Sequence, residues 1–348
     1  MILKKTFHFN VSLLMIFCGF LSVSCTSISV KTVHGIPSQE LWSPEKSYDR
    51  GSVPFLVQKE NEDFKILLFS DIQLESSPKD RRSLRLVDQL VKEIQPDLIL
   101  TTGDNTSWRY ADKRALKLIR QMESYNIPWG VTLGNHDSEG RSDRIWLGNQ
   151  YENAKNSLFR SGPSNIDGIG NYSINIQDEE GNPVYTLIMM DSNEGRNYGE
   201  NFAYDFIHYN QIEWYEWLIN GINTTEMKVI PSMLFFHIPL QEFEKAYQAL
   251  ENNRIDKSTA FGEIRESISA SPVNTGFFDR ALALKSTTHI FCGHDHRNNL
   301  SVDWKGIRLT YGLKTGPTCY SDPDMNGATL ITIEAGSNEV LVKHIYLY

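Results

Sequence analysis

The feature of this sequence that most limits its fold is the alternation of continuous apolar runs with stretches of helical periodicity. The apolar runs lie at 64–70, 97–102 and 129–133, and the helical patterns between them at 84–94 and 115–122. Gln95-Pro96 ends the first helical pattern. Strands that are apolar on both faces and separated by amphipathic helices are typical of a parallel or mixed sheet covered by helices. The sequence therefore predicts an α/β fold.

The second half of the chain continues this pattern with more strands. We expect a hairpin between 171–177 and 185–191, a helix around 211–218, a strand at 231–237 and a β-rich end from His289 onward. With 348 residues, of which 40% are hydrophobic, the chain can bury the core of one large domain. We place this domain at residues 61–348. Residues 25–60 lack sustained periodicity and are interpreted as a tether and lead-in segment.

The first 24 residues differ from the rest of the chain and are interpreted as an export signal. Lys4 and Lys5 precede an apolar run at 11–23 that is too short to cross a bilayer. The run leads into Ser22-Val23-Ser24-Cys25, which resembles a bacterial lipoprotein box with Cys25 as the lipidated first residue. Ordinary signal cleavage after small residues is the alternative. Both interpretations predict an exported protein, either in the periplasm or anchored by lipid to the cell envelope.

Charge and cysteine content narrow the function further. Removing the two lysines of the signal changes the formal net charge from −9 to about −11, and we expect no binding of nucleic acid to such an acidic chain. Cys292 and Cys319 are the only cysteines after Cys25. A disulfide between these two is possible in an oxidising compartment, but we favour a reduced Cys292 buried in a strand.

The apolar runs end in residues that could bind a metal. The segments at the ends of five runs are Asp71-Ile72-Gln73, Gly103-Asp104-Asn105, Gly134-Asn135-His136-Asp137, His237 and Gly293-His294-Asp295-His296. Ligands in open α/β sheets bind beyond the carboxyl ends of the strands, so these segments are expected to meet. Singly, a Gly-Asp after a strand is usually a turn, and a lone histidine in an apolar strand is usually a core residue. The ordered set, with four of the nine histidines, favours a metal site.

This ordered set resembles the calcineurin-like metallophosphoesterase superfamily, whose pattern is D-x-H, GD, GNH[DE], a distal H and GHxH. The resemblance extends over residues 64–311 in the family's order. The stretches IPWGVTLGNHD, FFHIPL, NTGFF and FCGHDH are similar to the branch that includes plant proteins labelled purple-acid-phosphatase-like. The resemblance implies a four-layer α/β/β/α sandwich of two mixed sheets, with a dinuclear metal site at the carboxyl-terminal edge of the strands.

The same resemblance implies the ligands of two metal ions bridged by Asp104. The first ion would be held by Asp71, Gln73 and His296, and the second by Asn135, His237 and His294. Nitrogen and oxygen ligands without a thiolate suit Fe, Mn or Zn, as divalent or trivalent ions. Two such ions activate a water as hydroxide, and His136 would protonate the leaving oxygen. The implied function is hydrolysis of small phosphate esters, with monoesters favoured.

Two positions depart from the family pattern. Gln73 stands where the pattern has histidine, and Ser107 stands where true purple acid phosphatases have their tyrosine ligand. An amide oxygen is neutral like imidazole but binds more weakly, so a working site with one loosely held ion is favoured. Two alternatives stay open: a phosphodiesterase with the same site, and an inactive module that only binds phosphate or sugar. Arg141 and Arg144 follow the GNHD motif, and a solvated loop is favoured over a phosphate contact for both.

Overall fold

Two β-sheets form the centre of the protein, and the computed structural model describes residues 41–75 and 78–347. The smaller sheet has the strand order β14-β13-β2-β3-β4. Its strands are β2 (Phe64–Phe69), β3 (Leu98–Thr102), β4 (Trp129–Thr132), β13 (Gly327–Ile333) and β14 (Val340–Tyr346). β2, β3 and β4 run parallel and are joined by helices, which is the usual connection between neighbouring parallel strands. β13 is antiparallel to β2, and β14 is antiparallel to β13.

The larger sheet has seven strands in the order β1-β5-β6-β9-β10-β12-β11. They are β1 (Phe55–Val57), β5 (Tyr172–Gln177), β6 (Pro183–Met189), β9 (Ser232–Phe235), β10 (Thr287–Cys292), β11 (Ser301–Trp304) and β12 (Ile307–Tyr311). β6, β9, β10 and β12 are parallel, whereas β5 and β11 are antiparallel to their neighbours in this group. β7 (Gly195–Tyr198) and β8 (Asn201–Tyr204) form a separate hairpin.

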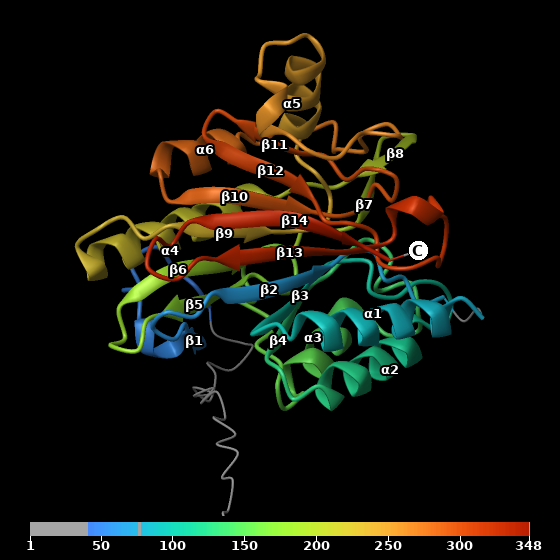
Figure 1. Cartoon of the computed structure of the whole chain (residues 1–348), viewed down its shortest axis with the longest axis horizontal. Coiled ribbons are helices and arrows are strands. Elements are labelled where there is room, and N and C mark those ends of the chain that lie inside the picture. Colours follow the sequence, from blue (N-terminus) through green and yellow to red (C-terminus); the bar gives the residue numbers. More distant parts are fainter. Residues whose placement is uncertain (1–40, 76–77, 348) are drawn as a thin grey trace, which may run out of the picture.

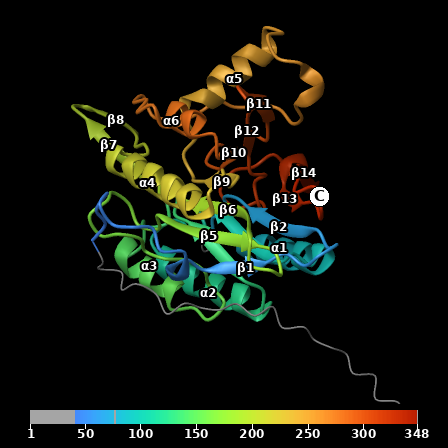
Figure 2. The ribbon, with the colours of Figure 1, turned by 90° about the vertical axis from the view of Figure 1, so that its left-hand side faces the viewer.

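Helices cover the outer face of each sheet, as Figures 1 and 2 show. The five-stranded sheet carries α1 (Asp80–Ile94), α2 (Ala111–Ser124) and α3 (Arg144–Glu152), and the seven-stranded sheet carries α4 (Tyr209–Glu226), α5 (Gln241–Glu251) and α6 (Phe277–Leu284). The predicted helices correspond to α1, α2 and α4. α1 ends where the sequence predicts, because Gln95 adopts a left-handed conformation with φ 49° and Pro96 follows it.

Alternating side chains in the central strands of the larger sheet define the layers. In β6, Leu187 and Met189 belong to the core that also contains the strands of the smaller sheet. Ile188 and the following Met190 point the other way and pack with Trp214 of α4. Both faces of β6 are therefore buried, one against a sheet and one against helices. This arrangement confirms the predicted four-layer α/β/β/α sandwich of two mixed sheets.

The folded domain begins earlier than the predicted residue 61. β1 pairs in parallel with β5 at the edge of the larger sheet, with Leu56 opposite Ile176. Trp42 is buried, and its backbone N–H donates to Asn165 Oδ1 at 2.8 Å. β1 has only three residues, and Trp42 is a single buried side chain, so neither produces a recognisable period in the sequence. For this reason the sequence predicts no structure in the lead-in segment. The predicted export signal at 1–24 and Cys25 lie outside the described residues.

Two further observations concern the membrane and the cysteines. Within residues 41–75 and 78–347, no helix is both long and apolar enough to cross a bilayer. Cys292 is a buried residue of β10, and it and Cys319 are free thiols. The predicted burial of Cys292 in a strand is therefore confirmed, and its reduced state stays a prediction.

Candidate metal centre

The polar segments that follow the strands meet at one edge of the two facing sheets. The smaller sheet supplies Asp71 and Gln73 after β2, Asp104 after β3, and Asn135 and His136 after β4. The larger sheet supplies His237 after β9, and His294 and His296 after β10. Distances among these residues link all eight of them. The structure thus places every predicted site residue in one centre.

One group of potential ligand atoms lies around Asp71. Atoms of Asp71, Asp104 and His296 lie within 4.8 Å of one another, and all three residues are buried. His296 Nε2 is 3.5 Å from Asp71 Oδ1. Gln73 faces the same group, because its Nε2 is 3.4 Å from Asp104 Oδ2. Its buried Oε1 has no hydrogen-bond partner among the described residues, so Gln73 offers a free oxygen at the position of the family's histidine.

A second group of potential ligand atoms shares Asp104. Atoms of Asp104, His237 and His294 lie within 4.8 Å of one another. His237 Nε2 is 3.2 Å from Asp104 Oδ2, 3.2 Å from His294 Nδ1 and 3.0 Å from Asn135 Oδ1. The buried His294 Nε2 accepts or donates no hydrogen bond in the part of the chain that the structure describes. The two groups therefore meet at one carboxylate.

These donors fit a pair of metal ions. They comprise two carboxylates, three imidazoles and two amides, and none is a thiolate. A buried polar atom without a partner costs about 1–3 kcal/mol, so Gln73 Oε1 and His294 Nε2 are expected to bind something. Nitrogen and oxygen donors at this spacing are suited to transition-metal ions.

Glycine at Gly134 is required for the close approach of the donors. A Cβ at this position would lie 2.2 Å from Asp104 Oδ1 and 2.2 Å from the Asp104 backbone nitrogen. Such contacts are too short for any other residue, because the obstacle includes backbone. The glycine before Asn135 thus has the role that the sequence pattern suggests.

The loop after β2 holds Asp71 and Gln73 in strained conformations, with φ values of 51° and 47°. Left-handed conformations cost about 1 kcal/mol or more for residues with a side chain and persist only when neighbours fix them. Here Lys314 Nζ donates to the Asp71 carbonyl at 2.6 Å, and Thr318 Oγ1 donates to the Ile72 carbonyl at 2.6 Å. The 314–318 segment thus positions the loop that carries Gln73.

The carboxylates and histidines of the centre shift each other's pKa values. Burial alone would raise the pKa of Asp71, but His296 and His237 lower it to about 2. The pKa of Asp104 is likewise lowered, because His237 outweighs the effect of burial. Burial would lower the pKa of His237, yet the charge of Asp104 raises it to about 9. Metal binding needs a neutral imidazole, so it would release a proton from His237 and weaken as the pH falls.

His136 lies at the mouth of the centre, with its side chain 38% exposed. Its backbone N–H donates to Asp104 Oδ1 at 2.9 Å, and its ring Nε2 is 3.9 Å from Asp104 Oδ2. On the other side of the ring, Nδ1 is 2.6 Å from Glu139 Oε1. Burial lowers the pKa of His136, but the carboxylates of Asp104 and Glu139 raise it overall. The position of this imidazole and its raised pKa suit a proton donor.

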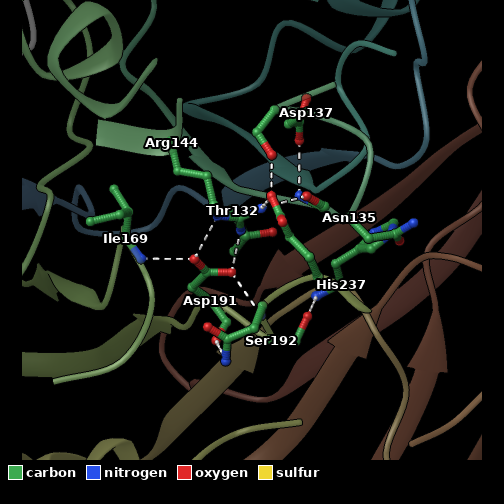
Figure 3. Close-up of polar contacts among 12 residues, drawn as sticks. Thr132, Asn135, Asp137, Arg144, Ile169, Asp191, Ser192 and His237 are labelled. Atoms are coloured by element: carbon green, nitrogen blue, oxygen red, sulfur yellow. Dashed lines mark hydrogen bonds and ion pairs between the residues drawn. The ribbon is translucent and has the colours of Figure 1, made fainter. Parts of the chain in front are cut away.

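Arg144 is a partly buried brace at the start of α3, which corrects the expectation of a solvated loop residue. Its guanidinium makes a two-point ion pair with Asp191, with distances of 2.5 Å and 3.3 Å (Figure 3). It also donates to the Gly134 carbonyl at 2.9 Å and to Glu194 Oε1 at 3.0 Å. The carboxylates of Asp191 and Glu194 outweigh the effect of burial and raise the pKa of Arg144. The charge of Arg144 is thus paired with carboxylates of the protein, next to Asn135.

The brace connects ligands that come from different sheets. Asp191 and Ser192 follow β6 of the larger sheet, and Ser192 Oγ accepts the backbone N–H groups of His237 (3.2 Å) and Ile238 (2.9 Å). Arg144 therefore joins the backbone before Asn135 to the segment that holds His237 (Figure 3). Sequence reasoning missed Asp191, and its place directly after the apolar run of β6 was the available signal.

Asp137, the last residue of the GNHD motif, ties the loops after β3 and β4 together. Its carboxylate accepts the backbone N–H groups of Gly134 and Thr106, each at 2.8 Å. It also accepts a hydrogen bond from Asn105 Nδ2 at 3.1 Å. Asp137 is therefore a positioning residue.

Comparison with protein families identifies this arrangement. The model of the calcineurin-like phosphoesterase family matches residues 64–298, which is more than half of the chain. The chain belongs to this family. Within this phosphoesterase, the match begins at β2 and ends just after His296, so it contains every predicted site residue.

Named relatives of this calcineurin-like phosphoesterase come from plants and yeast. The chain is 28% identical over 295 residues to "Probable inactive purple acid phosphatase 29" of Arabidopsis thaliana, covering 75% of this chain and 74% of the relative. It is 28% identical over 261 residues to "Phosphatase DCR2" of Saccharomyces cerevisiae, covering 68% of this chain and 44% of the relative. The resemblance to the purple-acid-phosphatase-like branch is thereby confirmed.

A solved structure supports the fold alone. A dimetal phosphatase from Danio rerio superposes with a TM-score of 0.50 at 11% identity, covering 81% of this chain and 99% of that protein. This likeness agrees with the four-layer fold. The family assignment and the two groups of ligand atoms agree with a site for two metal ions.

Proposed function

We propose that this calcineurin-like phosphoesterase is an exported, metal-dependent enzyme that hydrolyses phosphate esters, with monoesters as preferred substrates. The observation that carries the proposal is the pair of ligand groups that share Asp104. It is supported by two buried atoms without hydrogen-bond partners in the described structure, Gln73 Oε1 and His294 Nε2. The other polar atom of each side chain, Gln73 Nε2 and His294 Nδ1, contacts Asp104 and His237 of these groups. A decayed site would have had no reason to keep such costly atoms buried.

The proposal assigns the donors of each ion. The first ion takes Asp71, Gln73, Asp104 and His296, and the second takes Asp104, Asn135, His237 and His294. The mixed nitrogen and oxygen set favours Fe, Mn or Zn. When bound, such ions polarise the phosphoryl oxygens and make a nearby water more acidic.

The residues of the chain then account for orientation and proton transfer. In hydrolysis a water oxygen forms a bond to phosphorus, and the bond from phosphorus to the ester oxygen breaks with its electron pair on that oxygen. His136 donates the proton that this leaving oxygen needs from Nε2, because Nδ1 is held by Glu139. The exposed edge of His136 can recover a proton from solvent. The products are an alcohol and inorganic phosphate.

The test is a single preparation of the full chain purified without chelator. We expect about two Fe, Mn or Zn ions per chain and hydrolysis of p-nitrophenyl phosphate that a chelator abolishes. His136→Asn should reduce kcat by about 100-fold or more without removing the metals, since it loses only the proton donor. Bis(p-nitrophenyl) phosphate serves as the comparison substrate, and faster cleavage of this diester would replace the monoesterase by a phosphodiesterase.

A second candidate function is an inactive binding module. It is favoured by the word "inactive" in the relative's name and by the amide at Gln73. This candidate requires at most one ion per chain and no turnover after addition of Mn, Fe or Zn. Phosphate binding measured by calorimetry would then persist in the His136→Asn variant.

Export is proposed from the sequence of residues 1–24 and Cys25. Lys4, Lys5 and the apolar run at 11–23 support it. We expect the protein in the envelope fraction of a bacterial host, labelled by a radioactive fatty acid. Cys25→Ala should abolish the label, whereas a soluble, unlabelled periplasmic protein would support ordinary signal cleavage.

A further inference from the structure

Two tyrosines lie against the histidines of the candidate metal centre. The ring of Tyr320 stacks on His296, with centroids 4.2 Å apart and planes at 28°. The ring of Tyr204, from β8, meets His294 edge to face with centroids 4.2 Å apart. Tyr320 is 47% exposed and Tyr204 is half-buried, so both rings also border solvent. A substrate whose phosphoryl group binds in the centre would have its organic part beside these rings.

Glu266 brings a carboxylate to the same border. Tyr320 Oη donates to Glu266 Oε1 at 3.3 Å, and the Arg297 backbone N–H donates to the same oxygen at 2.9 Å. Burial and then the charge of Glu266 raise the pKa of Tyr320. Burial and nearby carboxylates, Glu266 among them, also raise the pKa of Tyr204. Glu266 thus lies beside Tyr320, whose ring stacks on His296.

The arginines of this border are already paired. Arg265 makes ion pairs with Glu263 (2.7 Å), Asp322 (3.2 Å) and Asp324 (2.8 Å). Arg297 pairs with Asp322 at 2.8 Å. Together with Glu266, four carboxylates face two guanidinium groups, which gives a net charge of −2. A second phosphate or a carboxylate on the substrate would be repelled here, whereas a cation would be attracted.

We propose that the alcohol part of the natural substrate carries an ammonium or quaternary ammonium group, as in phosphocholine. This inference rests on the proposed function and specifies its substrate class. Aromatic faces and a carboxylate are the groups that recognise quaternary ammonium ions, since the ring quadrupole and the negative charge both attract a weakly hydrated cation. A neutral sugar phosphate would use the rings but gain nothing from Glu266. A nucleoside polyphosphate would need free cations at this border.

The test compares two substrates of equal shape. Phosphocholine and 3,3-dimethylbutyl phosphate differ only in a charged nitrogen in place of a neutral carbon. We expect kcat/KM to be about tenfold higher for phosphocholine, and this ratio to fall about three- to tenfold in Glu266→Gln. Tyr320→Leu should lower the ratio similarly, while Tyr320→Phe, which keeps the ring, should largely retain it. Glu216→Gln, which removes the carboxylate of an ion pair with Arg280 on other helices, is the matched control and should leave the ratio unchanged.

Two further measurements keep the inference open to refutation. Tetramethylammonium should inhibit p-nitrophenyl phosphate hydrolysis by the unmodified protein more strongly than Na⁺ at equal ionic strength. Glycerophosphocholine, assayed in parallel, reveals whether the choline arrives as a free monoester or as a diester head group, and a Glu266-dependent preference for either supports the inference. Equal rates on the two isosteric phosphates, with p-nitrophenyl phosphate hydrolysed, overturn this inference alone. No hydrolysis of any ester, with metals bound, overturns the proposed function instead.

Discussion

The two halves of the candidate centre are built differently. In the half around His237, the backbone before Asn135 and the segment holding His237 are joined through the ion pair between Arg144 and the buried Asp191. In the half around Gln73, a strained loop is held by hydrogen bonds from Lys314 and Thr318. The backbone N–H of Gln73 also donates to the Asp104 carbonyl at 2.8 Å. The half around Gln73 also has an amide where the family pattern has an imidazole. The comparison teaches that affinity for the two ions is expected to be unequal, with the tighter site where the two sheets are braced.

The largest effect is expected where the halves meet. Asp104→Asn removes the charge that both ligand groups share. Hydrolysis of p-nitrophenyl phosphate should fall by at least about 10,000-fold, with less than one ion retained per chain, because the two groups act as a unit. Asp97→Asn is the matched control, since it removes a carboxylate at the opposite end of β3. Retention of one tightly bound ion in Asp104→Asn would show that the halves do not share this carboxylate.

The second prediction breaks the braced half. Arg144→Met leaves Asp191 buried without its partner, so the free energy of unfolding in urea should fall by about 3–5 kcal/mol. Metal analysis should show loss of the second ion before the first. Arg144→Lys should recover part of the stability, because one ammonium cannot reproduce the two-point contact. Arg280→Met removes an exposed ion pair and should change stability by less than about 0.5 kcal/mol. Equal loss of both ions in Arg144→Met would contradict the assignment of the brace to one half.

The third prediction concerns the segment 294–299, which supplies His294 to one half of the centre and His296 to the other. His344 of β14 is bonded through Nε2 to the Asn299 carbonyl at 2.7 Å, three residues beyond His296. Burial lowers the pKa of His344 to about 4 from an ordinary 6.5. The folded state therefore resists its protonation, so this group has no effect above pH 6.5 and costs stability as the pH falls toward 4, by about 2 kcal/mol at pH 5.

His344→Gln provides the measurement. The amide keeps a hydrogen-bond donor but cannot titrate, so the loss of unfolding free energy between pH 7 and 5 should be smaller than in the unmodified protein. His289, whose pKa burial also lowers to about 4, keeps its own acid sensitivity in the variant and serves as an internal reference. Identical pH slopes for variant and unmodified protein would mean that His344 titrates normally.

The smallest effect is expected from changing the ligand atom at position 73. Gln73→His restores the family's imidazole, and the dissociation constant of the weaker ion should decrease about tenfold, or about 1.4 kcal/mol. Gln73→Leu, which has similar bulk and no donor, should increase it. Titration with Mn²⁺ of protein that a chelator has freed of metal measures the dissociation constant of the weaker ion in both variants. If neither variant changes the weaker constant, Gln73 is not a ligand.

Much of the fold and the ligand set could be predicted because their signals are local. Runs apolar on both faces predict buried parallel strands, and β2, β3 and β4 follow that prediction. The polar residues that follow these strands could then be predicted to lie together at one edge of the sheet. The layering of two sheets came from the family resemblance, since periodicity does not say whether strands share a sheet.

The rest depends on contacts between distant segments, which leave no period in the sequence. Arg144 seemed to be a loop residue because its partner Asp191 lies 47 positions away. β1 and Trp42 were assigned to a lead-in because their pairing with β5 and Asn165 is equally remote. Tyr204 was likewise unnoticed, since only the fold of the β7–β8 hairpin brings it to His294.

The centre lies on the seam between the two sheets, where Asp104 of one comes within 3.2 Å of His237 of the other. A slip of one sheet across the other by a fraction of that length would separate the donors while leaving each sheet's own ladder of hydrogen bonds intact. Turnover should consequently disappear during gentle warming before circular dichroism registers any change. Under the proposed function, hydrolysis would therefore report how well the two sheets pack against each other.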